Sequence, residues 1–275
     1  MKKIIVPLDF SNCSTNALKN AITMADRLHA QLILCHALTL PIGFAEGAPV
    51  GLTDYGFDEL QDKAEKDIKD LVSKFPLIER LTYTSVVQFG PLPEVVNVQI
   101  NKEEDALVVM GTHGAKGFIG ALLGTNTYNV IKHVKCPVLA LPENADLTQM
   151  NKIALAGDYK DIPSHEVLHF ISDLAKAFYA HLYIVHIDHQ DTLQNQELEI
   201  ARSMEKYLKH VNHSFIFRKD DDLEQGLMAL VNKEKIQLLA MISKQHSFIE
   251  RLTKPSETKS IILHIPMPIL VLQDK

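Results

Sequence analysis

The stretch Ala106–Thr127, ALVVMGTHGAKGFIGALLGTNT, decides the fold class of this chain of 275 residues. An apolar run is followed by Gly111, Gly114 and Gly124, after which helical periodicity begins. This is the order of a strand, a glycine-rich loop and a helix start. Glycines let backbone N–H groups approach a ligand closely, and the unpaired N–H groups of a helix start attract anions. The stretch therefore predicts a phosphate site, with a plain turn and helix cap as the alternative.

Short β-rich runs alternate with helical periodicity through the first half of the chain. Apolar residues recur at helical spacing behind Ser11 or Ser14, either of which can cap the helix, and again over residues 60–72 and 95–100. Strands that alternate with helices imply right-handed crossovers and a parallel sheet covered on both faces. Such sheets bind ligands at the carboxyl ends of their strands. The expected strands are residues 2–8, 31–37, 82–88, 106–111 and 138–141.

The second half of the chain repeats the first. Residues 110–141 align with residues 241–272 without a gap, and two earlier pairs of segments also match. We therefore predict an α/β protein of two tandem domains, residues 1–145 and 150–275, each a doubly wound five-stranded parallel sheet. Each domain is of ordinary size and large enough to bury its own core. The earlier matching segments are Lys3–Phe10 with Lys152–Tyr159 and Ala30–His36 with Ala180–His186.

The composition argues against several classes of protein. No apolar run reaches the roughly 18 residues of a membrane span, so we expect no membrane association. A net charge of −6 and a pI near 6.1 argue against a nucleic-acid surface, which needs clustered Lys and Arg. Cys13, Cys35 and Cys136 form no CxxC pair, which favours a reduced, cytoplasmic location.

Three features together resemble the universal stress protein family. They are the glycine spacing, the strand Lys3–Leu8 followed by Asp9, and the closing segment Lys135–Leu141. The nucleotide motif of that family has this glycine spacing followed by Ser or Thr. The resemblance covers essentially the whole chain, in weaker form in the second half. It implies that the ligand is an adenine nucleotide, ATP with or without Mg²⁺. It also implies a non-catalytic stress-response module that reports adenylate level to a protein partner, which the sequence does not identify.

The resemblance also assigns site residues in the first half. We expect the carboxylate of Asp9 to accept hydrogen bonds from ribose hydroxyls or the adenine amino group, and Leu8 and Met110 to sandwich the base. Asp9 as a helix N-cap is an alternative that is compatible with this role. The adenine and ribose contacts fall on Pro7, Leu8, Asp9, Ala37 and Met110, and the phosphate contacts on Gly111, His113, Gly114, Gly124, Thr125, Asn126 and Thr127.

The second half keeps the framework and loses the glycines. Ile242, Gln245 and Pro255 stand where the first half has its three glycines, so close backbone approach and one N–H donor are lost. We expect one ATP per chain, bound in the first half. The second half is then a structural partner domain. The alternative is that it has a pocket for another small molecule, lined by Gln245 and His246.

Other chemistry finds little support in the sequence. There is no Walker lysine after the glycines and no GxGxxG after the first strand. No general base can be named, so a slow ATPase is the second function class and a nucleotide-free scaffold the third. His165 and His169 lie at i, i+4 on an expected helix, but Glu or Cys ligands at fixed spacing are missing. We expect these to be surface and core histidines, with no metal site and no catalytic residue.

Two further expectations concern a loop and the assembly of the halves. Residues 38–58 form a long loop after the second strand, and we expect it to fold over the nucleotide, with disorder in the absence of ligand as the alternative. Residues 138–141 and 269–272 are the last strands of their halves, and an apolar edge strand invites pairing. We expect these two strands to pair antiparallel within the chain, as an internal pseudo-dimer of two sheets. Any homodimer would then use other surfaces.

Overall fold

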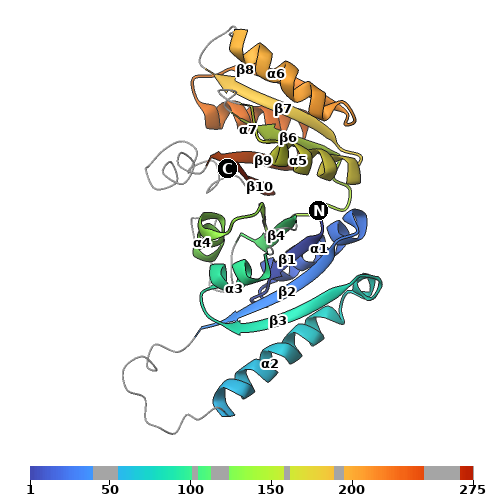
Figure 1. Ribbon diagram of the computed structural model, residues 1–275, viewed down its shortest axis with the longest axis vertical. Helices are drawn as coiled ribbons and strands as arrows, with labels where there is room; N and C mark the ends of the chain where they lie inside the picture. Colours follow the sequence, from blue (N-terminus) through green and yellow to red (C-terminus); the bar gives the residue numbers. More distant parts are fainter. Residues whose placement is uncertain are drawn as a thin grey trace.

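The computed structural model describes residues 1–39, 55–100, 105–112, 124–157, 162–188, 195–244 and 267–274. In these ranges the strands form one ten-stranded sheet in the order β3-β2-β1-β4-β5-β10-β9-β6-β7-β8. The sheet runs along the long axis of the molecule, with the two halves one above the other (Figure 1). The chain is therefore α/β, as the alternation of strands and helices predicts.

The first half contains strands β1 to β5, which are parallel to one another. The five strands lie within a residue or so of the expected ranges, and Ser11 caps the first helix. The strands are β1 Lys3–Pro7, β2 Gln31–Leu38, β3 Tyr83–Phe89, β4 Ala106–Gly111 and β5 Val138–Leu141. The helices are α1 Asn12–Leu28, α2 Tyr55–Val72, α3 Leu92–Gln99 and α4 Thr125–His133, with a 3-10 helix η2 over Pro76–Arg80.

The second half repeats this order with strands that are again parallel to one another. Its strands are β6 Lys152–Ala156, β7 His181–Asp188, β8 His213–Lys219, β9 Leu238–Lys244 and β10 Ile269–Asp274. Its helices are α5 His165–Ala177, α6 Asn195–Leu208 and α7 Leu223–Glu234.

Two hydrophobic clusters form the core, one on each face of the sheet. One contains the buried side chains of α1, α2, α5 and α6, and the other those of α3, α4 and α7. Side chains that alternate along each strand enter the two clusters in turn, as in Ile4 and Ile5 of β1. Burial of each large aliphatic side chain contributes about 1.5–3 kcal/mol, so the two clusters hold the helices on the sheet.

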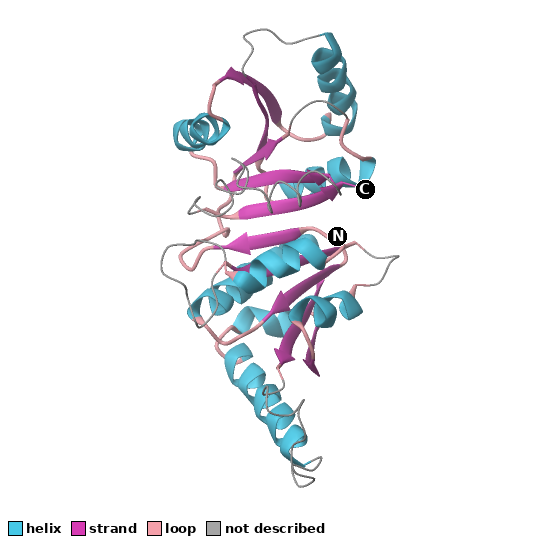
Figure 2. Cartoon of the chain, turned by 90° about the vertical axis from the view of Figure 1, so that its left-hand side faces the viewer, coloured by secondary structure: helices cyan, strands magenta, loops and turns pink. Residues whose placement is uncertain are grey.

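The two halves meet where β5 pairs antiparallel with β10. Leu139 lies opposite Leu270 and both are fully buried. This confirms the expected antiparallel pairing, which satisfies the backbone groups that an edge strand leaves unpaired. The product is one continuous sheet and not a pair of separate sheets (Figure 2).

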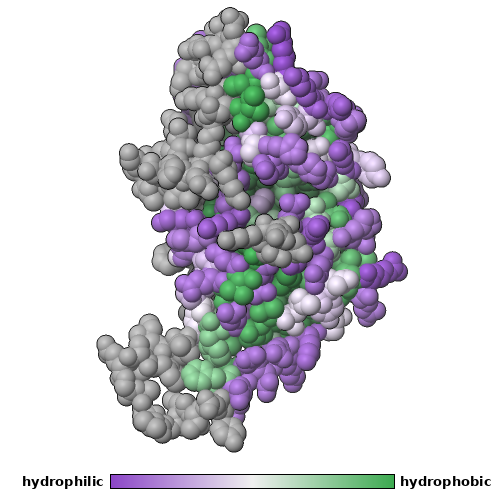
Figure 3. Space-filling model, viewed as in Figure 1, coloured by the Kyte–Doolittle hydropathy of each residue, from purple (hydrophilic) through white to green (hydrophobic). Residues whose placement is uncertain are grey.

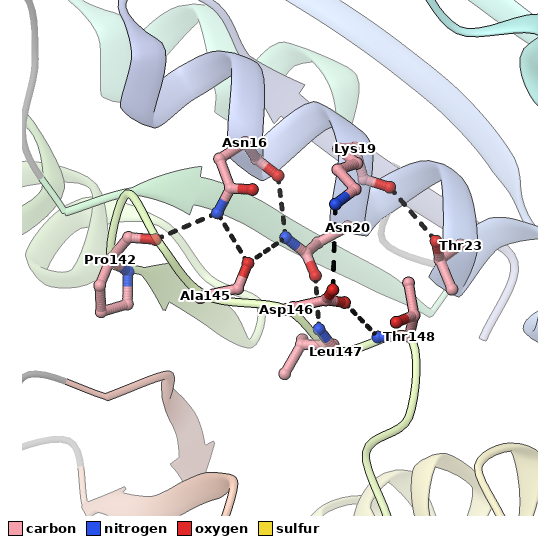
Figure 4. A network of polar contacts seen from close by, with 9 residues as sticks. All are labelled: Asn16, Lys19, Asn20, Thr23, Pro142, Ala145, Asp146, Leu147 and Thr148. Carbon is pink, nitrogen blue, oxygen red and sulfur yellow. Dashed lines mark hydrogen bonds and ion pairs between the residues drawn. The ribbon is translucent and has the colours of Figure 1, made fainter.

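The segment between β5 and β6 is fastened to α1 by two asparagines (Figure 4). The Nδ2 atom of Asn16 donates to the carbonyl oxygens of Pro142, at 3.2 Å, and Ala145, at 2.9 Å. Asn20 is buried. Its Nδ2 donates to Ala145 O at 3.0 Å, and its Oδ1 accepts from the Leu147 N–H at 2.7 Å. Buried amide groups need such partners, so these bonds hold the connecting segment in one path.

The outer surface is largely polar on the face shown in Figure 3, where hydrophobic side chains show through between hydrophilic ones. None of the helices in the described ranges combines the length and the apolar composition that a bilayer span requires.

Candidate functional site

The candidate site lies at the carboxyl ends of β1 and β4. The chain leaves β1 into α1, whose N-cap is Ser11, and Gly124 is the N-cap of α4. The starts of the two helices therefore flank the end of β4. Gly111 lies against the first turn of α1, and the Gly124 N–H donates a hydrogen bond to the carbonyl oxygen of Thr112, the residue that follows β4. Helix starts present unpaired N–H groups and the positive end of the helix dipole, so this edge suits an anion.

Asp9 organises the turn between β1 and α1. Its Oδ1 accepts hydrogen bonds from the Ser11 N–H at 3.1 Å and the Ser11 hydroxyl at 2.6 Å. Ser11 Oγ in turn accepts from the Ser14 N–H at 3.1 Å. Phe10, between them, has a φ of 63°, a conformation that is uncommon for a bulky residue and is held here by the bonds around it. The alternative that Asp9 caps the helix is wrong, because Ser11 is the cap and Asp9 orients it.

His36 fixes the residue that follows β1. Its Nδ1 lies 2.6 Å from the carbonyl oxygen of Leu8, whose N–H donates to Cys35 O at 2.8 Å. The ring of Phe10 lies 5.0 Å from the His36 ring, between centroids. His36 was not among the expected site residues. The internal repeat could have identified His36, because it aligns His36 with His186.

The second half keeps this histidine contact. The Nδ1 atom of His186 lies 3.2 Å from the carbonyl oxygen of Gly157, the residue that follows β6. A histidine on the second strand therefore holds the end of the first strand in both halves. This common contact points to a positioning role that does not depend on the glycine loop.

Gly111 is required by the packing of α1. A Cβ at this position would lie 2.7 Å from Cys13 Sγ and 2.8 Å from the Cys13 carbonyl carbon. Real Cβ atoms essentially never approach so closely, so only glycine lets the first turn of α1 cross the end of β4. Gly111 is expected from the sequence to contact phosphate, and the structure adds a packing reason for the glycine.

Thr127 ties α4 to the end of β4. It is 2% exposed, and its hydroxyl donates to Gly111 O at 2.8 Å. Gly124 N–H donates to Thr112 O at 2.5 Å, and Thr112 N–H to Leu141 O at 2.9 Å. The Thr127 hydroxyl therefore donates to the protein backbone, although the family resemblance places a phosphate contact at Thr127.

The exposed part of the α4 start consists of Thr125 and Asn126. Both are exposed residues of the first helical turn, and Gly124 as N-cap provides no side-chain hydrogen bond to that turn. A hydroxyl, an amide and backbone N–H groups that no described side chain caps therefore lie together at one end of a helix. These are donors that can bind the oxygens of an anion.

The expected adenine sandwich does not form. Leu8 and Met110 are each 4% exposed, and Leu8 belongs to the cluster under α1 and α2 while Met110 belongs to the cluster under α3 and α4. Their side chains lie on opposite faces of the sheet, so they cannot enclose one ring. The expectation fails because strand residues alternate between faces. Pro7 is the buried last residue of β1, and Ala37 is half-buried near the end of β2.

Several expected positions lie outside the described residues. They are His113 and Gly114 of the glycine loop, residues 40–54 of the expected lid, and Gln245, His246 and Pro255 of the second half. Ile242, which replaces Gly111 in the repeat, is a half-buried residue of β9. A side chain therefore occupies the position where the first half has none.

Two buried cysteines, Cys35 and Cys136, are not reactive thiolates. Burial raises the pKa of Cys35, next to Leu8 in the hydrogen-bond pattern, to about 12, and burial does the same for Cys136. Within the described part of the chain, no three or more His, Cys, Asp or Glu residues gather as a metal site.

Comparisons with known proteins agree with this architecture. The model of the universal stress protein family matches residues 1–142. A universal stress protein of Methanocaldococcus jannaschii is 32% identical over 143 residues, which is 51% of this chain and 81% of that protein. The crystal structure of a universal stress protein from Archaeoglobus fulgidus DSM 4304 matches 98% of both chains with a TM-score of 0.75 at 17% identity, which shows a shared fold.

Another universal stress protein from Archaeoglobus fulgidus was solved in complex with dAMP. It matches 46% of this chain and 99% of its own length, with a TM-score of 0.34 and 13% identity, and an overlap of that size supports no argument about this chain. The family model and the Methanocaldococcus relative cover the half that contains β1 to β5 and the glycine-rich stretch. The chain belongs to the universal stress protein family.

Proposed function

We propose that the protein binds one ATP per chain in its first half, and that the occupied state acts as a non-catalytic signal in the stress response. The observation that carries the proposal is the start of α4, where Thr125 and Asn126 are exposed beside backbone N–H groups to which the N-cap Gly124 offers no side-chain acceptor. Family membership supports the same function for residues 1–142.

The phosphates would lie at the start of α4. In this proposal Thr125 and Asn126 donate directly, while Gly111, Gly124 and Thr127 hold the two helix starts in place. His113 and Gly114, outside the described residues, are assigned to the same phosphates by the family resemblance alone. Charge-assisted hydrogen bonds contribute about 1.5–3 kcal/mol each, so three or four of them with a partly enclosed base suffice for micromolar affinity, about −8 kcal/mol. Mg²⁺ would bind through the phosphates.

The adenosine would lie at the ends of β1 and β2. The Asp9 carboxylate is half-buried there and Ala37 is half-buried on the neighbouring strand, with Pro7 and Leu8 forming the floor. Met110 would contribute through its backbone, because its side chain is in the core. Asp9 Oδ1 already accepts two hydrogen bonds from Ser11, so the turn is preorganised before a ribose hydroxyl arrives.

The second half would not bind ATP, because Ile242 fills the position of Gly111. We place the boundary between the two domains, residues 1–145 and 150–275, in the segment that Asn16 and Asn20 hold. The partner that reads the occupied state is a protein, and the location is the cytoplasm. A slow ATPase is the second candidate, but no described residue has the position of a general base.

The test is direct. The purified chain is heated, any released nucleotide is identified by mass, and the chain is then titrated with ATP by calorimetry, with and without Mg²⁺. We expect one site per chain, lost in Gly124→Val and in Gly114→Val because a branched side chain occupies the phosphate path. Gln245→Val, at the position that matches Gly114, is the control and should bind ATP normally. Two equivalent sites, or unchanged affinity in both glycine variants with native circular dichroism, would overturn the proposal.

A further inference from the structure

Two histidines on the surface of α5 form a pair with the spacing of metal ligands. The helix begins His165-Glu166-Val167-Leu168-His169, so the two imidazoles are at i and i+4 on one face, and both residues are exposed. Their ring centroids are 5.8 Å apart. A pair of histidines at this spacing, with Glu after the first, is the pattern in which a helix holds zinc.

Asp173 prepares His169 for this role. Its Oδ2 lies 3.1 Å from Nδ1 of His169, one helical turn away, and its other oxygen lies 3.8 Å from Lys176 Nζ. A carboxylate that accepts from Nδ1–H leaves the lone pair on Nε2, on the far side of the ring. Histidines that bind metal are commonly oriented by a carboxylate in this way.

His165 is held by its neighbours. Its ring meets the ring of Tyr207, from α6, edge to face at 5.5 Å between centroids. The turn that carries it is anchored, because Ser164 N–H donates to Asp274 Oδ1 at 3.1 Å and Ser164 Oγ accepts from the Val167 N–H at 3.4 Å. Asp274 is itself buried, at 9% exposure. The first turn of α5 is therefore fixed to the end of β10 without a ligand.

The distance between the rings suits a shared ion after a small adjustment. Two imidazoles that bind one zinc at 2.0–2.1 Å have ring centroids roughly 5 Å apart. Binding of a shared ion would require a small rotation of the exposed His169 and His165 side chains that shortens the 5.8 Å separation to that value. Since the described residues offer no group of three or more His, Cys, Asp or Glu ligands, water would complete the coordination.

We propose that His165 and His169 bind one divalent transition-metal ion of the zinc class, with Asp173 as the positioning residue for His169. The ion has two protein ligands and open positions toward water. The site is on the second half of the chain, and it does not depend on the proposed nucleotide function. It replaces the expectation that these histidines have no role beyond the surface.

The experiment is a calorimetric titration of the full chain with ZnCl₂ at pH 7.5. We expect one zinc per chain through this pair, and loss of that site in His165→Ala and in His169→Ala. Asp173→Asn should weaken it by about 10-fold, the usual effect of removing a carboxylate behind a metal-binding histidine. His133→Ala, which removes an exposed histidine of α4, is the matched control and should leave the site intact.

Two further measurements separate the pair from the other histidines of the chain. Nitrogen-detected NMR of the imidazoles should show zinc on Nε2 of His169, and the signal should disappear when a chelator removes the metal. Circular dichroism confirms that each variant is folded. Absence of zinc binding in the unmodified chain, or equal affinity in His165→Ala, His169→Ala and the control, would overturn the proposal.

Discussion

Replacing Gly111 with alanine tests the close contact between β4 and α1. The new Cβ would lie 2.8 Å from the carbonyl carbon of Cys13, and ordinary contacts begin at 3.4 Å, so the backbone there must recede by 0.6 Å. A main-chain atom in the first turn of a helix cannot rotate away as a side chain can. Overpacking of this kind costs about 1–3 kcal/mol. We therefore expect Gly111→Ala to lower the free energy of unfolding by that amount.

The assay is urea unfolding followed by circular dichroism, with Gly157→Ala as the matched control. Gly157 follows β6, and a Cβ there would meet only Ile242 Cδ1 at 3.8 Å, an ordinary contact. Its φ is not in the left-handed region, so alanine should be tolerated and change the stability by less than about 1 kcal/mol. If Gly111→Ala is as stable as the unmodified protein, the packing argument is wrong.

The Gly111→Ala variant also distinguishes a packing role of this glycine from a role in ligand binding. The first turn of α1 follows directly on the turn that Asp9 and Ser11 form, so a shift of that turn should also weaken ATP binding. A variant of unchanged stability that nevertheless loses ATP would mean that the missing Cβ serves the ligand alone.

Three other predictions follow from buried groups. Leu139→Lys combined with Leu270→Lys buries two charges at the β5–β10 junction, and light scattering should show separated halves and aggregation; a compact, monomeric variant would refute the pairing. Thr127→Val removes the donor to a β4 carbonyl, and thermal or urea unfolding should show a loss of about 1–3 kcal/mol, while no change would mean that the bond contributes nothing. Cys35 and Cys136, with pKa raised to about 12 by burial, should resist iodoacetamide at pH 8 until urea unfolds the chain, and rapid modification of the native protein detected by mass would contradict this.

The sequence determined the architecture of this protein, because its signals for architecture are local. Apolar periodicity distinguishes strands from helices, Ser11 marks a helix start, and the internal repeat shows that the order of elements occurs twice. Even the antiparallel pairing of β5 with β10 could be predicted, since apolar edge strands need partners.

Tertiary structure decided what the site residues do. Leu8 and Met110 are both apolar and lie at the carboxyl ends of β1 and β4, yet they enter clusters on opposite faces, and only the direction of each side chain determines this. Thr127 has a hydroxyl that any phosphate could use, but that hydroxyl donates to Gly111 O.

Gly111 itself shows the limit of inference from sequence. A glycine at the end of a strand permits close approach, but the sequence does not say what approaches, and in this fold the answer includes Cys13 of α1. His165 and His169 show the same limit, because their spacing and that of Asp173 are visible in the sequence, whereas the contact with Tyr207 depends on how α5 and α6 pack. Periodicity and repeats arise from the chain alone, but the partner of a side chain depends on segments distant in sequence, which only the folded structure brings together.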